Sequence, residues 1–339
     1  MKYKNHKYRN HGCHLSTSLI CILLFLLICG TAVSCARPSS PISRTGFYFD
    51  TVITITLYDE GQESVLDDCF SLCGQEEALL SRTVKGSDIY NINSSKGRPV
   101  TVSLDTARLL EKALDYSRLS DGAFDCTIAP LTTLWNIKEN TGDIPSEEKI
   151  EDALSHVSYK NIVIDKNTVT LKDPEASIDL GGIAKGYIAD RLKELLLSKG
   201  VKNALINLGG NVYALGTKPD GSPYNIGIQK PFAQEGTALT SVKISGQSLV
   251  TSGIYERYFE KDGRIYHHLL DPHTGWPASN GLYSVTILSE NSVDADALST
   301  ACFILGEEKG MELIESLEGT EAMFVTDKEE LHYSSGFPR

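Results

Sequence analysis

Helical and extended patterns follow one another in this 339-residue chain without a steady strand–helix–strand rhythm. A regular alternation would build a doubly wound parallel sheet, whereas an irregular order of strands and helices favours an α+β fold. No internal repeat and no long linker interrupts the chain after residue 45. We therefore expect one large α+β domain over residues 46–335, with a mixed or antiparallel sheet and flanking helices.

The strands and helices of this domain are predicted from hydrophobic periodicity. Ile53, Ile55 and Leu57 alternate with threonines, which is typical of a half-buried strand. Ser103 precedes an apolar run with helical spacing and suits the N-cap position. Helices are expected within 63–82, 103–120, 145–157, 294–306 and 307–319, and one more runs to about 198, where Gly200 stops it. Strands or hairpins are expected within 51–60, 161–173, 203–216, 241–253, 263–277 and 284–288, and a final strand at 321–327.

Residues 1–34 have the pattern of an export signal. Four basic residues and no acids precede an apolar run at 19–30, and small residues such as Ala32 precede Cys35. The apolar run is shorter than the ~20 residues that a membrane-spanning helix needs. The small residues and the cysteine resemble a bacterial lipobox, and a plain signal peptide or an anchor helix is the alternative. We expect an extracytoplasmic protein held to a bacterial membrane by acyl chains, palmitate among them, on Cys35, with a tether over 35–45.

Charge and cysteine spacing argue against two classes of site. Loss of the leader removes four basic residues and changes the formal net charge from −12 to −16, which disfavours nucleic acid as a partner. Cys69, Cys73, Cys126 and Cys302 remain in the domain, and no pair has the CxxC spacing typical of zinc sites. We expect these cysteines to be buried as small hydrophobic side chains.

The stretch DLGGIAKGYIADRL, residues 179–192, leads from a strand end through two glycines into a helix. Gly181 and Gly182 allow close approach of the backbone to a ligand, and Lys185 adds a cation at the helix N-terminus, where anions bind. The spacing is neither that of a P-loop nor that of a dinucleotide fingerprint. From the residues alone, a phosphate cradle and an ordinary structural turn are equally supported.

Three of the five histidines outside the leader fall in HHLLDPHTGWP, residues 267–277. Proline and glycine fix a rigid turn, and histidine is the side chain that most often moves protons near neutral pH. The cluster therefore favours a catalytic segment over a surface hairpin turn with histidine caps.

Asp296 and Thr300, in DADALST, are four residues apart and share one face of a predicted helix. With a backbone carbonyl from elsewhere, they would form an all-oxygen ligand set that suits Mg²⁺. An aspartate that merely caps a helix is the alternative.

Seven segments together resemble the successive signature blocks of the ApbE family, the FAD:protein FMN transferases. The segments are FYFDTVITI, GAFDCTIAPLTTLW, IDLGGIAKGYIADRL, INLGGNVYALG, TSGIYERYF, HHLLDPHTGWP and SVDADALSTACFILG. They occur in the family's order and cover the chain from about residue 45 to residue 330. The resemblance implies Mg²⁺-dependent transfer of FMN from FAD to a Thr or Ser hydroxyl of a target protein, through a phosphoester bond, with release of AMP.

The resemblance also implies roles for individual residues. The Ala184 carbonyl, Asp296 and Thr300 would bind Mg²⁺, and His268 would be the base toward the acceptor hydroxyl. Asp271 would orient that histidine or support the turn. The expected FAD contacts are Phe49, Thr83, Ala123, Phe124, Asp125, Asp179, Gly181, Gly182, Lys185 and Leu282. Phe49 departs from the family, which often has methionine at that position.

Two other functions use the same residues. A hydrolase would split FAD to AMP and FMN with water, and a binding lipoprotein would hold FAD unchanged. The presence of Asp296, Thr300 and His268 together favours catalysis, since binding alone needs neither a metal nor a base. The expected partners are FAD, an acceptor protein of a flavin-dependent electron-transfer system and the membrane.

Overall fold

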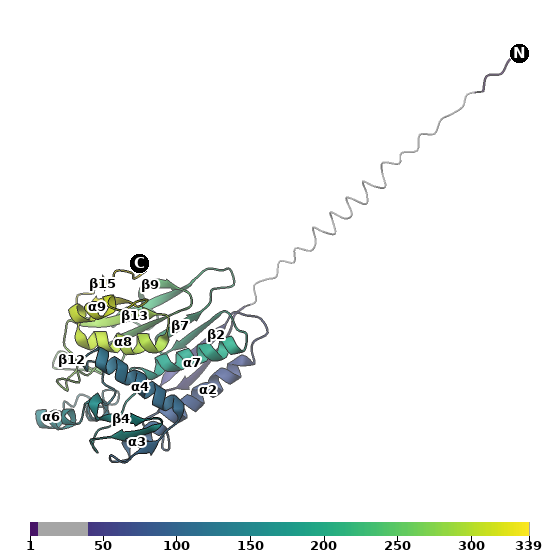
Figure 1. Cartoon of the computed structure of the whole chain (residues 1–339). Coiled ribbons are helices and arrows are strands. Elements are labelled where there is room, and N and C mark those ends of the chain that lie inside the picture. The colour runs from purple at the N-terminus through teal and green to yellow at the C-terminus, as the bar shows by residue number, and fades with distance from the viewer. Residues whose placement is uncertain (6–39, 339) are drawn as a thin grey trace. The chain divides into compact units, whose positions relative to one another are not determined.

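An eight-stranded sheet organises the chain from residue 40 onward in this computed structural model, which describes residues 1–5 and 40–338 (Figure 1). The strand order is β1-β2-β6-β7-β10-β13-β14-β15, and every neighbouring pair is antiparallel. Its strands are β1 (Ile42–Tyr48), β2 (Thr51–Leu57), β6 (Ala204–Leu208), β7 (Asn211–Leu215), β10 (Gln247–Gly253), β13 (Leu282–Ser289), β14 (Glu321–Thr326) and β15 (Leu331–Tyr333). The predicted α+β fold with an antiparallel sheet is confirmed.

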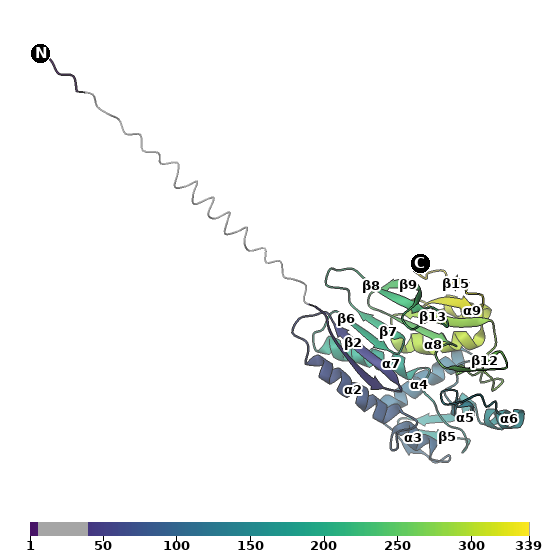
Figure 2. The same cartoon turned by 180° about the vertical axis from the view of Figure 1, so that it is seen from behind.

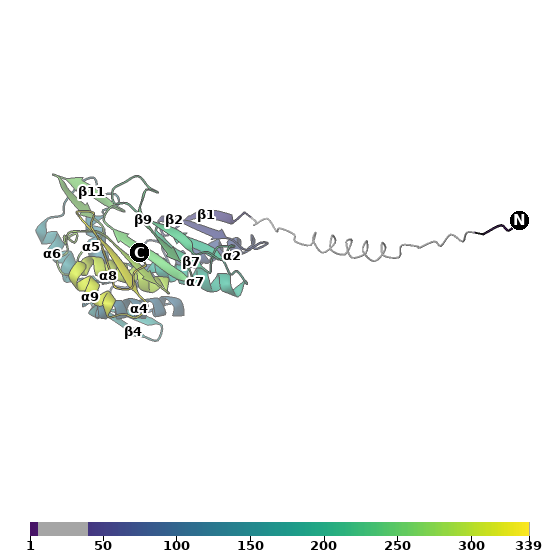
Figure 3. The ribbon, with the colours of Figure 1, turned by 90° about the horizontal axis from the view of Figure 1, so that it is seen from above.

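Helices cover one face of this sheet (Figures 2 and 3). The helices are α2 (Val65–Leu80), α3 (Asp88–Asn93), α4 (Leu104–Leu119), α5 (Ala129–Trp135), α6 (Glu147–Ser155), α7 (Ala184–Ser198), α8 (Ser292–Leu305) and α9 (Glu307–Glu315). Helices α2, α7, α8 and α9 pack directly on the strands, and α4 packs against α8. The main hydrophobic core lies between these helices and the sheet.

Smaller sheets complete the domain. The hairpin of β8 (Tyr224–Gln229) and β9 (Ala238–Ile244) packs on the face of the large sheet that the helices leave open. Its apolar side chains form a cluster with those side chains of β7, β10, β13 and β14 that point away from the helices. Strands β3 (Val100–Thr101), β5 (Thr168–Leu171) and β4 (Ile162–Asp165) form a second sheet. The hairpin of β11 (Tyr258–Lys261) and β12 (Arg264–His267) shares a third apolar cluster with α5 and α6.

Local patterns in the sequence predict most of these elements. Ile53, Ile55 and Leu57 are fully buried on one face of β2, and the Ser103 hydroxyl caps α4 by accepting from the Thr106 N–H at 3.0 Å. The four cysteines of the domain are free and buried, as expected. Helices α3 and α5 were not predicted, because one or two turns are too short to display a periodicity.

Two expected boundaries are wrong. Strand β1 begins at Ile42, inside the segment 35–45 that was expected to be a tether, and pairs along its length with β2. The strand at 321–327 is not the last, since β15 pairs with it and forms the sheet edge. Both errors concern edge strands, whose stability comes from pairing and not from a local pattern.

The predicted leader and the lipidation site Cys35 lie outside the described residues, apart from residues 1–5. Among the residues that are described, no helix is both long enough and apolar enough to span a bilayer. The lipid anchor therefore stays a prediction.

Helices α7 and α8 lie side by side (Figure 1), and Gly186 of α7 lies directly against α8. A Cβ atom at Gly186 would lie 2.3 Å from the Ser292 carbonyl oxygen and 2.7 Å from the Asp296 Cβ. Because the first of these atoms is backbone, a side chain at 186 would force the two helices apart.

We predict that Gly186→Ala destabilises the protein by about 1–3 kcal/mol through overpacking. The matched control is Gly74→Ala in α2, where the new Cβ would lie 3.6 Å from the Tyr48 ring. This control should be neutral or stabilising by up to about 1 kcal/mol, because alanine favours helix more than glycine does. Urea unfolding measures both changes, and equal stability of the two variants would contradict the packing argument.

Candidate functional site

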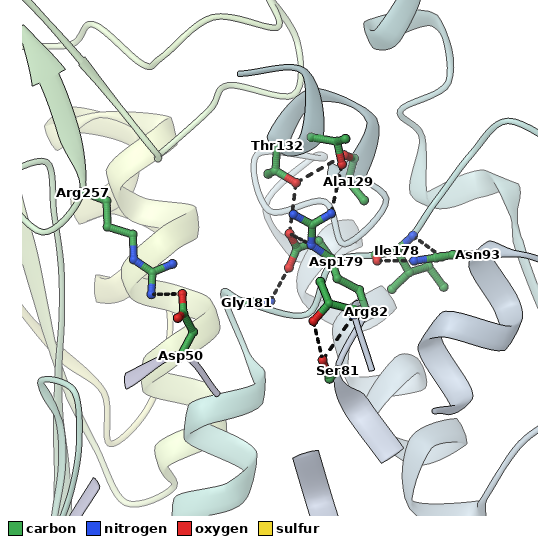
Figure 4. Close-up of polar contacts among 12 residues, drawn as sticks. Asp50, Ser81, Arg82, Asn93, Ala129, Thr132, Ile178, Asp179, Gly181 and Arg257 are labelled. Carbon is green, nitrogen blue, oxygen red and sulfur yellow. Dashed lines mark hydrogen bonds and ion pairs between the residues drawn. The ribbon is translucent and has the colours of Figure 1, made fainter. Parts of the chain in front are cut away.

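The two residues that precede the predicted glycine turn are held by hydrogen bonds to other parts of the chain. The Asn93 side chain pairs with the Ile178 backbone, donating to its carbonyl at 2.9 Å and accepting from its N–H at 2.7 Å (Figure 4). The Asp179 N–H donates to the Cys126 carbonyl at 2.8 Å. The segment therefore enters α7 in a fixed path, with Gly181 exposed at the surface.

The Asp179 carboxylate ties three parts of the chain together (Figure 4). One oxygen accepts from the Gly181 N–H at 2.9 Å, and the other accepts from the Thr132 hydroxyl at 3.0 Å and lies 3.1 Å from Arg82 Nε. Arg82 follows α2, and Thr132 belongs to α5. The predicted ligand residue Asp179 thus fixes the turn by its own hydrogen bonds.

The first turn of α7 meets the Asp296 carboxylate of α8. The Gly186 N–H donates to Asp296 Oδ2 at 2.9 Å, inside the protein. Lys185 Nζ lies 3.5 Å from Oδ1 and 3.3 Å from the Gly181 carbonyl. The Asp296 side chain is 3 % exposed, so this carboxylate is buried. Its Oδ1 faces the Lys185 ammonium group at 3.5 Å, which is long for a hydrogen bond between charged groups.

Thr300 lies one turn further along α8, against the glycine turn. A Cβ added to Gly182 would lie 3.2 Å from Thr300 Oγ1 and 3.2 Å from the Phe124 ring. The Ser252 hydroxyl lies 3.4 Å from the Thr300 hydroxyl. Three separate signature blocks, those of Phe124, Gly182 and Thr300, therefore meet at one place.

The expected Mg²⁺ ligands are grouped in this region. Ala184 lies in the chain between Gly182, which faces Thr300, and Gly186, which donates to Asp296. In the described part of the chain no three His, Cys, Asp or Glu side chains form a metal-binding cluster. One carboxylate, one hydroxyl and one carbonyl would leave about half of the positions of an octahedral ion to water and phosphate, which suits Mg²⁺. The donor set and the incompletely paired Asp296 fit that ion.

His268 is available as a base, whereas the adjacent His267 is not. His268 Nδ1 lies 3.3 Å from the Arg257 carbonyl, which only accepts, so Nδ1 carries the proton, and no residue in the described part of the chain forms a hydrogen bond with Nε2. His267 has the opposite arrangement, with its Nδ1 accepting from the Leu269 N–H and its Nε2 donating to the Ala278 carbonyl. Burial, followed by the charges of His267 and Arg257, lowers the pKa of His268 well below its usual value, so the ring is neutral at pH 7.

Asp271 supports the turn, and its hydrogen bonds do not reach His268. Its Oδ1 accepts from the His273 N–H at 2.8 Å and lies 3.1 Å from His273 Nδ1, and its Oδ2 accepts from the Thr274 hydroxyl. Of the two roles that the sequence left open, these contacts are those of turn support. None of the hydrogen bonds of the Asp271 carboxylate in the described part of the chain supports the expected role of orienting His268.

The remaining expected FAD contacts are spread around the site. Asp125 is buried and accepts from the Thr127 N–H, the Thr127 hydroxyl and the Tyr159 N–H, so its carboxylate is occupied within the protein. Ala123 and Leu282 are also buried, and Leu282 packs in the main core. Phe49 is half-buried in the β1–β2 turn, and Thr83 is exposed after α2.

Four residues of the site were missed in the sequence: Arg82, Thr132, Asp190 and Arg257. Arg82 and Thr132 hold Asp179, the Arg257 carbonyl sets the His268 tautomer, and Asp190 contacts the start of α8. Thr132, Asp190 and Arg257 lie inside signature blocks, and Asp190 also follows Gly186 by one helical turn and so shares its face.

Known proteins resemble this chain in sequence. The profile of the ApbE family matches residues 49–324. A Klebsiella pneumoniae (strain 342) protein named FAD:protein FMN transferase is 41 % identical over 286 residues, covering 84 % of this chain and 88 % of that protein. A protein of the same name from Treponema pallidum (strain Nichols) is 33 % identical over 338 residues, covering 94 % and 92 %.

Solved structures share the fold. The crystal structure of the ApbE protein of Thermotoga maritima MSB8 superposes with a TM-score of 0.82 at 32 % identity, covering 88 % of this chain and 100 % of that one. The flavin transferase ApbE of Vibrio cholerae superposes with a TM-score of 0.80 at 27 % identity, covering 88 % and 99 %. By sequence profile, by curated relatives and by fold, this chain belongs to the ApbE family.

Proposed function

We propose that this protein transfers FMN from FAD to a Thr or Ser hydroxyl of another protein, with release of AMP. The observation that carries the proposal is the grouping of a neutral histidine with a free Nε2, a lysine at a glycine turn and a buried carboxylate. Lys185 Nζ lies 3.3 Å from the Gly181 carbonyl and 3.5 Å from Asp296 Oδ1, and the charge of this lysine is the smallest of the effects that lower the pKa of His268. The curated relatives bear the name of this activity.

The chain's own groups supply the steps of the transfer. His268 Nε2 takes the proton of the acceptor hydroxyl, whose oxygen attacks the phosphorus of the FMN half of FAD. The bond from that phosphorus to the bridging oxygen breaks, and AMP leaves with the electron pair. Lys185 and the N-terminus of α7 stabilise the negative charge of the phosphates, and the Asp179 contacts keep the glycine turn in position.

A metal ion would complete the site. The Ala184 carbonyl, Asp296 and Thr300 would hold Mg²⁺, and the bound ion would neutralise charge on the pyrophosphate. The sequence pattern before Cys35 supports attachment to the outer side of a bacterial membrane through lipid on that cysteine. A protein of a flavin-dependent electron-transfer system is the acceptor that this location and chemistry suit.

One incubation tests the activity. The chain from residue 36, which contains the whole folded unit that begins at Ser40, is mixed with FAD, Mg²⁺ and a candidate acceptor protein. AMP together with acceptor-bound flavin fluorescence on a denaturing gel supports the transferase. AMP and free FMN without an acceptor would indicate a hydrolase, and absence of AMP would leave a binding protein.

We predict that His268→Gln lowers kcat by about 10²–10⁴-fold, the usual contribution of a general base. His332→Gln is the matched control, since that histidine pairs with Glu307 away from the site. In the unchanged protein, kcat/KM should stay level as the pH falls through 6.5, because the pKa of His268 is lowered and the ring protonates only at more acidic pH. A decline with an apparent pKa of 6.5 or higher would contradict the assignment, whereas one centred on about 6 would match the raised pKa of Asp190.

We predict that Asp296→Ala abolishes turnover at every Mg²⁺ concentration, because the carboxylate at the centre of the metal site is lost. Asp294→Ala is the control on the same helix, whose carboxylate contacts Tyr116 and Lys112. Rates are measured as AMP release across a Mg²⁺ titration. An undiminished rate for the Asp296 variant would exclude the metal assignment.

A further inference from the structure

Asp190 on α7 holds the beginning of α8, the helix that carries Asp296 and Thr300. Its Oδ1 accepts from the Ser292 N–H at 2.9 Å, and its Oδ2 accepts from the Val293 N–H at 2.8 Å. The N-cap residue Asn291 makes no side-chain cap bond, so a carboxylate from another helix performs that task. Burial raises the pKa of Asp190 to about 6, and the group is ionised above that pH.

This contact is one half of a reciprocal pair. Gly186 and Asp190 are one turn apart on α7, and Ser292 and Asp296 are one turn apart on α8. The Gly186 N–H donates to Asp296, and the Ser292 N–H donates to Asp190. Each helix therefore accepts a backbone hydrogen bond from the other, and a shift of α8 along α7 would break both contacts together.

A buried polar network fixes the same point from the sheet. The Ser292 hydroxyl donates to Asn211 Oδ1 at 2.7 Å and accepts from the Ser248 hydroxyl at 2.9 Å. Ser292 is fully buried, so these bonds are made away from solvent. The first turn of α8 is thus fixed in two ways. Asp190 of α7 binds its backbone N–H groups, and residues of β7 and β10 bind the Ser292 side chain.

We infer that Asp190 is a positioning residue for the metal site. It acts through α8, by setting where Asp296 and Thr300 stand relative to the first turn of α7. The inference rests on the proposed Mg²⁺ site, and it assigns the geometry of that site to a residue that contacts neither ligand side chain. Residues that orient metal ligands typically contribute about 10–100-fold to metal affinity.

The test is Asp190→Asn, which keeps the size of the side chain and turns one acceptor into a donor that faces a backbone N–H. The matched control is Asp59→Asn. The Asp59 carboxylate also accepts from two consecutive backbone N–H groups, those of Lys202 and Asn203, and none of its partners belongs to the site. Mn²⁺ is titrated into each protein with ADP at a pH above 6, and free Mn²⁺ is followed by its EPR signal against an ADP blank.

We expect Asp190→Asn to weaken Mn²⁺ binding about tenfold or more and Asp59→Asn to leave it unchanged, while both lower the melting temperature. Excess Mg²⁺ should restore AMP release to Asp190→Asn, because the ligands are displaced and not removed. If Asp190→Asn is unfolded, Asp190→Glu carries the same test, since it keeps the charge and moves the carboxylate by one methylene.

Unchanged Mn²⁺ affinity in the Asp190 variant would make this residue an ordinary structural cap and overturn the inference. Equal loss of affinity in both variants would also overturn it, because the loss would then follow from instability alone. Absence of Mn²⁺ binding by the unchanged protein would reject the metal site itself, and with it this inference. That outcome is distinguishable, since it precedes any substitution.

Discussion

The contact between α7 and α8 is the constraint on which the rest of the site depends. Two helices approach this closely only where one lacks a side chain, and Gly186 provides that position against the Ser292 carbonyl. The same approach allows the Gly186 N–H to reach the buried Asp296 carboxylate. The same residue therefore serves packing and the site. Because Gly186 has no Cβ, the two helices can touch, and the Gly186 N–H can then donate to the Asp296 carboxylate.

The glycine turn shows how much the sequence could establish about the site. DLGGIAKGYIADRL by itself was compatible with a simple turn, and nothing within it decides otherwise. Its hydrogen bonds reach groups that lie 47 and 110 residues away in the chain, namely Thr132 and Asp296. Resemblance to a family identified the segments of the candidate site, since it carries information from whole blocks, but it could not state which side chains hold the segments together.

Two aspartates of the signature blocks show what the sequence leaves open about side-chain contacts. Asp125 and Asp271 match signature blocks, yet each carboxylate is occupied by nearby N–H and hydroxyl groups. Short local bonds of this kind are the ordinary use of aspartate in turns. A sequence pattern identifies a position and not the partners of its side chain. The tautomers of His267 and His268 illustrate the same limit, since they depend on carbonyls that only the folded chain brings near.

Asp296 connects stability with function. A carboxylate that is 3 % exposed loses its hydration, and one backbone N–H with a lysine at 3.5 Å compensates only part of that loss. A protein under selection for stability alone would place an apolar side chain there, since buried charges are costly unless they are fully paired. A bound cation at Oδ1 would supply the missing compensation. The incomplete pairing of this buried oxygen is what the proposed metal site would require, and the polar contacts that fix α8 keep the oxygen in place.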